Sequence, residues 1–325
     1  MVQGPGIYES PQPNLLRDIF PYSEVPRIKL GHPILPLTPA REMFITDSTF
    51  REGRQGGPPL GHDEALDLFE LLHRLSGPEG VIRHTEFFLY TERDRRLVDL
   101  CRSREHDYPW ITGWIRASEK DLRLVVEAGL KETGILTSAS DYHIYLKLGS
   151  TRKAIAERYL RVIQMALDRG IVPRCGFEDI TRADVYGFCI PFAVELMRLR
   201  EQSGVDLKIR LSDTLGLGLT YPGAALPRGV PALVRAFIED AGVPGHLLEW
   251  HGHNDFHQAL TNSATAWLYG CHGVSGTLGG VGERTGNASV EALLAERAAL
   301  KDLLPVNGPA QPQIGDPASG FTQST

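Results

Sequence analysis

The sequence lacks the features that identify most secreted, membrane-bound and nucleic-acid-binding proteins. Its 325 residues include four cysteines, none in a C-x-x-C pair, and its N-terminus lacks the charged, apolar and small-residue order of a signal peptide. No apolar run approaches the roughly 20 residues that cross a bilayer, which excludes a membrane span. The net charge of −6 argues against nucleic acid or an anionic membrane as a partner. We therefore expect a cytoplasmic enzyme that acts on small molecules.

The composition is otherwise that of an ordinary globular protein, with 42% hydrophobic and 23% charged residues. Both ends differ from the middle. Residues 1–40 are rich in proline, which predicts an extended N-terminal arm. Residues 305–325 have few apolar residues, which predicts a short disordered C-terminal tail. The catalytic domain is expected to occupy residues 41–304.

Between these ends, β-rich apolar segments alternate with helical patterns. Helical spacing of apolar residues is clear in 64–75, 119–130, 155–170 and 231–242. Strands are expected within 43–50, 80–90, 108–117, 130–138, 172–180, 207–216, 247–255 and 273–282. Eight strands followed by helices over about 260 residues predict an α/β fold of the (β/α)₈ TIM-barrel type. A doubly wound open sheet is the alternative.

A barrel would gather its chemistry at the carboxyl ends of its strands, and those ends are unusually polar here. A single charged residue there is more often part of a rim salt bridge than of a site. Together, the polar residues indicate an active site at one mouth. They are Arg51, Glu52, Glu86, Arg116, Glu178, Thr214, His251 and His253.

The segment EWHGHNDFH at 249–257 raises the question of a metal site. His251 and His253 point to the same face of a strand, with Gly252 between them. A polar strand edge facing water would look the same. If a carboxylate such as Glu52 joins them, two imidazoles and one carboxylate leave positions open on a divalent cation. This ligand set suits manganese, cobalt, iron or zinc, and magnesium is also compatible. Arg51, beside Glu52, offers a guanidinium for an anionic substrate oxygen.

Three separated motifs resemble the signatures of the DRE-TIM metallolyase family. They are DSTFREG at 47–53, HGHND at 251–255 and GERTGN at 282–287. The resemblance covers roughly residues 40–300 and implies a TIM barrel. Within the family, GVIRHTEFFLY, KETGILTSASDYHIYLKL, GFEDITRAD, YPGAALPR and HGHNDFH look most like Re-citrate synthases and 2-phosphinomethylmalate synthases.

The resemblance implies roles for individual residues. It implies that Glu52, His251 and His253 hold the metal, with Asn287 at or near the same shell. Arg51 would polarise the carbonyl of a 2-oxo acid, and Glu86 would fix that arginine. Thr214 would bind the carboxylate of the 2-oxo acid, and Glu178 would form a polar wall beside it.

The implied reaction is a Claisen condensation of acetyl-CoA with a 2-oxo acid, followed by thioester hydrolysis. The 2-oxo acid is oxaloacetate or its phosphinate analogue phosphinopyruvate. The proton-accepting base is open among His84, His143 and His257, and His143 ranks first because its motif borders the substrate in the family. The distal anionic group of the substrate could be held by Arg116 or Arg182.

Other interpretations remain open at this stage. A carbon–carbon lyase of the same family would use a cysteine near the mouth, and Cys271, which precedes the last expected strand, is badly placed for that role. A barrel that binds metal and ligand without turnover is a third hypothesis, because the ordered pattern stops near Leu304 while many synthases continue into another subdomain. The glycines of GTLGGVGERTG do not match a dinucleotide fingerprint. The resemblance implies a homodimer, and the N-terminal arm either crosses to a neighbour or packs across the bottom of its own barrel.

Overall fold

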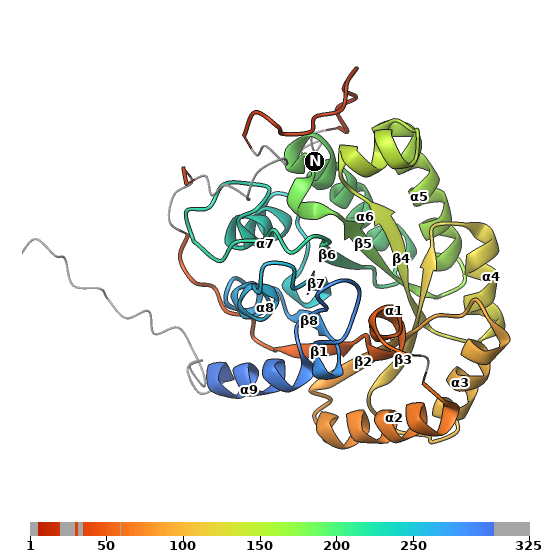
Figure 1. Ribbon diagram of the computed structural model, residues 1–325. Coiled ribbons are helices and arrows are strands. Elements are labelled where there is room, and N and C mark those ends of the chain that lie inside the picture. Colours follow the sequence, from red (N-terminus) through yellow and green to blue (C-terminus); the bar gives the residue numbers. More distant parts are fainter. Residues whose placement is uncertain (1–5, 20–29, 32–34, 59, 302–325) are drawn as a thin grey trace, which may run out of the picture.

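The computed structural model describes residues 6–19, 30–31, 35–58 and 60–301. Its parallel strands close into a barrel in sequence order, so the open-sheet alternative is wrong and the TIM barrel is confirmed. Figure 1 shows the strands at the centre with the helices around them. The strands are β1 (Phe44–Asp47), β2 (Ile82–Phe87), β3 (Trp110–Arg116), β4 (Glu132–Ser138), β5 (Val172–Glu178), β6 (Lys208–Asp213), β7 (Leu248–Gly252) and β8 (Gly273–Gly276). Each lies inside a segment expected to be a strand.

Helices follow the strands and cover the outside of the barrel. The α-helices are α1 (Arg54–Gly56), α2 (His62–Ser76), α3 (Glu92–Arg102), α4 (Glu119–Glu127), α5 (Arg152–Leu167), α6 (Ile190–Ser203), α7 (Val230–Glu239), α8 (Ala259–Leu268) and α9 (Val290–Lys301). Shorter turns are η1 (Thr49–Gly53), η2 (Tyr142–Lys147), η3 (Ile180–Arg182), η4 (Val185–Cys189), η5 (Gly245–Leu247) and η6 (Leu278–Gly280). The helical patterns at 64–75, 119–130, 155–170 and 231–242 correspond to α2, α4, α5 and α7. In the described part of the chain, no helix is long and apolar enough to cross a membrane.

The side chains that point outward from the barrel strands differ in polarity from those that point inward. Side chains that point outward from the strands, such as Ile115 and Ile209, are fully buried in an apolar layer against the helices. Side chains that point inward include Glu86, Arg174 and Arg210, which are also fully buried. The interior of a TIM barrel is usually filled by branched apolar residues, so this charged interior is unusual.

The described residues of the N-terminal arm contact both ends of their own barrel. Residues 8–15 bind the segments that follow β4 and β5, at the carboxyl end of the barrel and not across its bottom. Tyr8 N donates to Gly187 O over 3.1 Å, and the Tyr145 hydroxyl donates to Ser10 O over 2.8 Å. The backbone reaches the amino end of the barrel later, where Ala40 N donates to the carbonyl oxygen of Trp267. The expected disordered tail, 305–325, lies outside the described residues.

Candidate active site

Polar side chains converge on a cavity of about 170 Å³ at the carboxyl ends of the strands. Such a volume is below the usual range for drug-sized ligands, so the cavity suits a small molecule. Five of the eight strands, β3 to β7, and the loops that follow β1, β2, β6, β7 and β8 contribute to its wall. The lining residues are Arg51, Glu52, Gln55, Phe88, Trp114, Leu136, Glu178, Ser212, Thr214, His251, His253 and Glu283.

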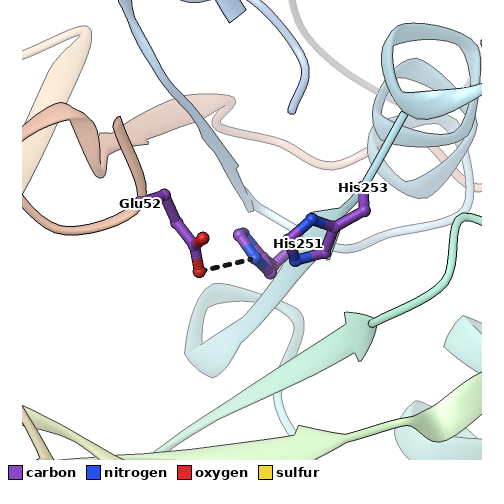
Figure 2. A group of neighbouring side chains, drawn as sticks. All are labelled: Glu52, His251 and His253. Atoms are coloured by element: carbon purple, nitrogen blue, oxygen red, sulfur yellow. Dashed lines mark ion pairs between the residues drawn. The ribbon is translucent and has the colours of Figure 1, made fainter. Parts of the chain in front are cut away.

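Glu52, His251 and His253 form one cluster in this cavity (Figure 2). Each offers a ligand atom, and the three atoms lie within 4.8 Å of one another. His251 Nε2 is 3.6 Å from Glu52 Oε1, and the two imidazole rings stand nearly perpendicular, with centroids 5.1 Å apart. The strand alternation that predicted a pair of imidazoles on one face is therefore confirmed, and Glu52 is the carboxylate beside them.

The unused polar atoms of this cluster fit a cation. Glu52 Oε2, His253 Nδ1 and both side-chain polar atoms of Asn287 are buried without a hydrogen-bond partner. Buried polar atoms without partners are rare, and a bound cation would give a partner to the three acceptors among them, Glu52 Oε2, His253 Nδ1 and Asn287 Oδ1. Asn287 lies here because its backbone pairs with that of His253 in an isolated bridge. His251 Nδ1 is 3.1 Å from Ser275 Oγ, so a proton on Nδ1 can be donated there and Nε2 remains free for a metal.

The electrostatics also favour a cation. Burial alone would raise the pKa of Glu52, but the charge of Arg51 and the neighbouring histidines hold it well below its usual value. Burial lowers the pKa of His251, although Glu52 opposes that effect. Burial, with the charge of His251, lowers the pKa of His253 to about 3. At neutral pH the cluster therefore presents one carboxylate and two neutral imidazoles, the protonation states that a metal requires.

Arg51 lies beside the cluster and is held from several sides. Its Nε donates to Glu86 Oε2 over 2.9 Å, and its Nη1 donates to Glu52. Its guanidinium carbon lies 4.3 Å from the centroid of the Trp114 ring. Nη2 is buried with no hydrogen-bond partner, and Arg51 lines the cavity. One pair of N–H bonds is thus left for a substrate oxygen.

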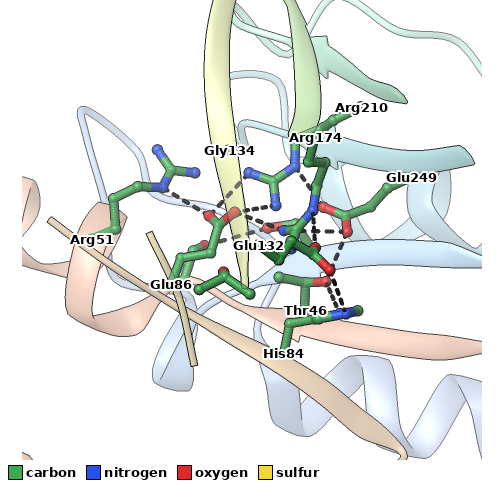
Figure 3. Close-up of polar contacts among 12 residues, drawn as sticks. Thr46, Arg51, His84, Glu86, Glu132, Gly134, Arg174, Arg210 and Glu249 are labelled. Atoms are coloured by element: carbon green, nitrogen blue, oxygen red, sulfur yellow. Dashed lines mark hydrogen bonds and ion pairs between the residues drawn. The ribbon is translucent and has the colours of Figure 1, made fainter. Parts of the chain in front are cut away.

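Glu86 itself does not line the cavity, and its carboxylate lies among buried charges beneath Arg51 (Figure 3). It also accepts hydrogen bonds from Arg174 Nη1 at 2.8 Å and from Arg210 Nη1 and Nη2 at 3.0 and 2.5 Å. Burial would raise the pKa of Glu86, but the three guanidinium groups lower it to about 2. The contacts of Glu86 are those of a residue that positions Arg51.

Glu178 lines the cavity, and His143, which is not among the lining residues, is bonded to it from behind the wall. His143, in η2, places Nδ1 3.0 Å from Glu178 Oε2, and its Nε2 is 3.8 Å from Asp179 Oδ2. The Ser138 hydroxyl also donates to Glu178 Oε2 over 2.8 Å. Burial would raise the pKa of Glu178, and the hydrogen bond from His143 is the main effect that brings it below its usual value. Thr214 lines the same cavity, and its hydroxyl accepts a hydrogen bond from Asp179 N.

Four other candidates are not brought to the cavity wall. Arg116 is two-thirds exposed and binds Asp121 through two nitrogens. Arg182 binds Asp179 and stacks over the ring of Tyr142. The remaining two are histidines. His84 lies in the amino-terminal half of the barrel, where its Nε2 is 3.1 Å from Lys208 Nζ, and His257 is exposed on the loop after β7.

Sequence reasoning did not single out several residues of the site. Ser275, which orients His251, stands on β8 in a segment noted only for glycines. Trp114 and Leu136 read as ordinary apolar strand residues, and Phe88 follows a strand. The signal that could have found Trp114 and Leu136 is alternation, because they point to the same side of their strands as Arg116 and Ser138.

Proteins of known sequence and structure resemble this chain closely. A citrate (Re)-synthase of Syntrophus aciditrophicus is 62% identical over 89% of the chain and 46% of its own length. A citrate (Re)-synthase of Clostridium kluyveri is 47% identical over 89% of the chain and 64% of its own length. A 2-phosphinomethylmalate synthase of Streptomyces hygroscopicus is 37% identical, over 88% and 66%. The chain thus spans about half to two thirds of the length of these curated relatives.

Solved structures agree on the fold. Hydroxymethylglutaryl-CoA lyase from Pseudomonas aeruginosa matches with a TM-score of 0.63 at 18% identity, over 81% of this chain and 87% of that one. The HMG-CoA lyase from Brucella melitensis matches with a TM-score of 0.57 at 19% identity, over 81% of this chain and 92% of that one. A family model described as HMGL-like matches residues 42–307, which is most of the barrel expected from the motifs. The chain belongs to the HMGL-like family.

Proposed function

We propose that this chain catalyses a metal-dependent condensation of acetyl-CoA with a small 2-oxo acid, followed by hydrolysis of the thioester. With oxaloacetate the products are citrate and CoA, and with phosphinopyruvate they are 2-phosphinomethylmalate and CoA. The observation that carries the proposal is the adjacency of the Glu52, His251 and His253 cluster to the unpartnered Nη2 of Arg51 in one small cavity. The names of the similar synthases support the same chemistry.

Glu52, His251, His253 and Asn287 would hold a divalent cation, manganese or cobalt being the first choices, and a cation bound there supplies Lewis-acid polarisation of the 2-oxo carbonyl. Arg51 contributes the charge-assisted hydrogen bond that stabilises the alkoxide as it forms. Because the guanidinium is already held by Glu86 and Glu52, little reorganisation is needed during the reaction. Thr214, which also lines the cavity, binds the carboxylate of the 2-oxo acid.

His143 is the base in this proposal. With its Nδ1 proton donated to Glu178, its Nε2 accepts a proton from the methyl group of acetyl-CoA. The resulting carbanion forms a bond to C2 of the 2-oxo acid, and the carbonyl electron pair becomes an alkoxide that is then protonated. The imidazolium formed at His143 is stabilised by the ionised Glu178 and by Asp179. Water then cleaves the thioester, which releases CoA.

The lyase alternative is less well supported by the structure. All four cysteines are buried, and none is among the residues that line the cavity. Cys271 precedes β8, at the amino end of the barrel, and its thiol donates to Gly273 O. Burial raises the pKa of the Cys271 thiol well above its usual value. A thiol in this state is neither placed nor ionised for a step at the cavity.

The test is release of free CoA thiol from acetyl-CoA and oxaloacetate, with Mn²⁺ or Co²⁺ and again after chelation. We expect metal-dependent release. His143→Asn should lower kcat by about 10²–10⁴-fold without weakening Mn²⁺ binding, whereas His251→Ala should abolish both. The matched control is His257→Asn, an exposed histidine on the same face that should leave both unchanged. No CoA release from a folded protein that binds Mn²⁺, with either oxaloacetate or phosphinopyruvate, would refute the proposal.

A further inference from the structure

Trp114 is a large apolar side chain in an otherwise charged part of the barrel interior. It stands on β3, only 9% exposed, and it lines the cavity. Two arginine side chains pack over its indole: the guanidinium carbons of Arg51 and Arg210 lie 4.3 and 5.1 Å from the ring centroid. The ring therefore contacts both the substrate cavity and the arginines that are bonded to Glu86.

Two glycines on neighbouring strands make room for this ring. Gly134 of β4 pairs directly with Trp114, and Gly176 belongs to β5. A Cβ atom at Gly134 would overlap Cε3 and Cζ3 of the indole, and one at Gly176 would lie 2.8 Å from its Cη2. Such distances are too short for any real contact. The indole thus lies against bare backbone, and Gly134 and Gly176 together form what we call the glycine seat.

The indole contacts both the glycine seat and the guanidinium groups of Arg51 and Arg210, so it cannot move away from the cavity without disturbing buried charges. Arg210, for example, forms ion pairs with both Glu86 and Glu249. A closely packed interior contains few voids, so a side chain inside it has little room to move. Trp114 is therefore a fixed wall beside Arg51, the group that meets the substrate carbonyl in the proposed function. Any 2-oxo acid bound at Arg51 must fit against this ring.

We propose that Trp114, held on the glycine seat, determines substrate specificity by limiting the length of the 2-oxo acid to the four-carbon dicarboxylate class or its phosphinate isostere. This inference rests on the proposed function for the identity of the substrate. The small cavity volume supports it, and so does the cost of enlarging the cavity, which would require displacement of a ring packed on the backbone. A one-methylene difference in a tight pocket typically changes kcat/KM by about 10–200-fold.

The first test compares oxaloacetate with 2-oxoglutarate, which is one methylene longer. Trp114→Leu should raise the ratio of kcat/KM for 2-oxoglutarate over oxaloacetate at least about tenfold. The ratio is the correct readout, because loss of the ring over Arg51 lowers turnover of both substrates alike. Trp110→Leu is the matched control, since it makes the same substitution at the opposite end of the same strand and should leave the ratio unchanged. An unchanged ratio in Trp114→Leu overturns the proposal.

The second test uses the glycine seat. Gly134→Ala should push the indole into the cavity and raise KM for oxaloacetate at least about tenfold, by the same methylene-scale argument. In the Trp114→Leu background, Gly134→Ala should change KM less than twofold, because no ring is left to displace. Equal effects in both backgrounds would show that Gly134 does not act through Trp114 and would overturn the proposal.

Binding measurements separate this inference from the proposed function. Calorimetry with Mn²⁺ and each 2-oxo acid, in the absence of acetyl-CoA, reports length selectivity without turnover. If wild type releases no CoA yet binds oxaloacetate at least tenfold more tightly than 2-oxoglutarate, and Trp114→Leu removes that preference, the specificity role stands and the condensation fails. If CoA is released but wild type binds and turns over both acids equally, the condensation stands and the role of Trp114 is overturned.

Discussion

Neutralising Glu86 should destabilise the barrel from its centre. Glu86 has no solvent exposure and accepts four hydrogen bonds from Arg51, Arg174 and Arg210. Glu86→Gln keeps the shape of the side chain but replaces a carboxylate by a neutral amide, much as protonation would. The guanidinium groups would then face a weaker acceptor and an amide donor in a region from which water is excluded. Breaking a buried pair in this way usually costs about 3–5 kcal/mol.

The pKa of Glu86 gives a second measure of the same effect. It falls from an ordinary value of 4.5 to about 2 in the folded protein. One pKa unit corresponds to about 1.4 kcal/mol, so the ionised form contributes roughly 3 kcal/mol of stability at neutral pH. Because the folded pKa is the lower one, this contribution is complete well above pH 4.5 and is lost as the pH falls toward 2. Of that contribution, roughly 1 kcal/mol should remain at pH 3.

Urea unfolding of wild type and Glu86→Gln at pH 7 and pH 3 tests both expectations. The free energy of unfolding should differ by about 3 kcal/mol at pH 7 and by about 1 kcal/mol at pH 3. Glu119→Gln is the control, because Glu119 forms an exposed pair with Arg123 one helical turn away, and its loss should cost less than about 0.5 kcal/mol. A Glu86→Gln protein as stable as wild type, or a difference that does not shrink with acid, would refute the reasoning.

Three further outcomes follow from the site and the arm. Ser275→Ala removes the group that orients His251 and should weaken Mn²⁺ binding about 10–100-fold in competition with a chelator; unchanged affinity would contradict the orienting role. Arg51→Lys should lower kcat for CoA release by about 10²–10³-fold while Mn²⁺ affinity stays within threefold, and a near-normal kcat would count against the oxyanion role. Tyr145→Phe removes the hydroxyl that binds Ser10 O and should speed limited proteolysis of residues 8–15; an unchanged cleavage rate would show that this bond does not hold the arm.

The strands and the clustering of Glu52, His251 and His253 were predictable because their signals are local. Alternation along 249–253 places His251 and His253 on one face without any knowledge of the neighbouring strands. The position of Glu52 follows from the fold rule that strand ends converge, once the strand at 44–47 is recognised. The resemblance of the motifs then added Asn287, whose location beside His253 no local pattern contains.

Other features depend on partners that are far away in sequence. His84 and His143 carried similar local signals, yet His84 lies three residues into β2 and contacts Lys208, whereas His143 lies beyond the end of β4 beside Glu178. The placement of Trp114 depends on glycines in β4 and β5, and the sequence of one strand does not show how its residues pair with those of the next strand. The path of the N-terminal arm was not predictable because a proline-rich extended segment has no periodicity to indicate a buried face.

The charged interior of the barrel needs an explanation other than stability. Its buried or nearly buried bases and acids balance in number, four of each, and they are Arg51, Arg174, Lys208 and Arg210 against Glu52, Glu86, Glu132 and Glu249. Such pairs often contribute no more to stability than well-packed apolar residues of similar volume. They do fix geometry, however, because every guanidinium in the set is bonded to at least one carboxylate from another strand. Arg51 is the member of this set that lines the cavity. Its Nε and Nη1 are bonded to carboxylates and its guanidinium packs over Trp114. Nη2 is therefore the nitrogen that remains free to bind a substrate. A preorganised donor of this kind stabilises developing charge without reorganisation, so we regard the interior charges as the support of the site.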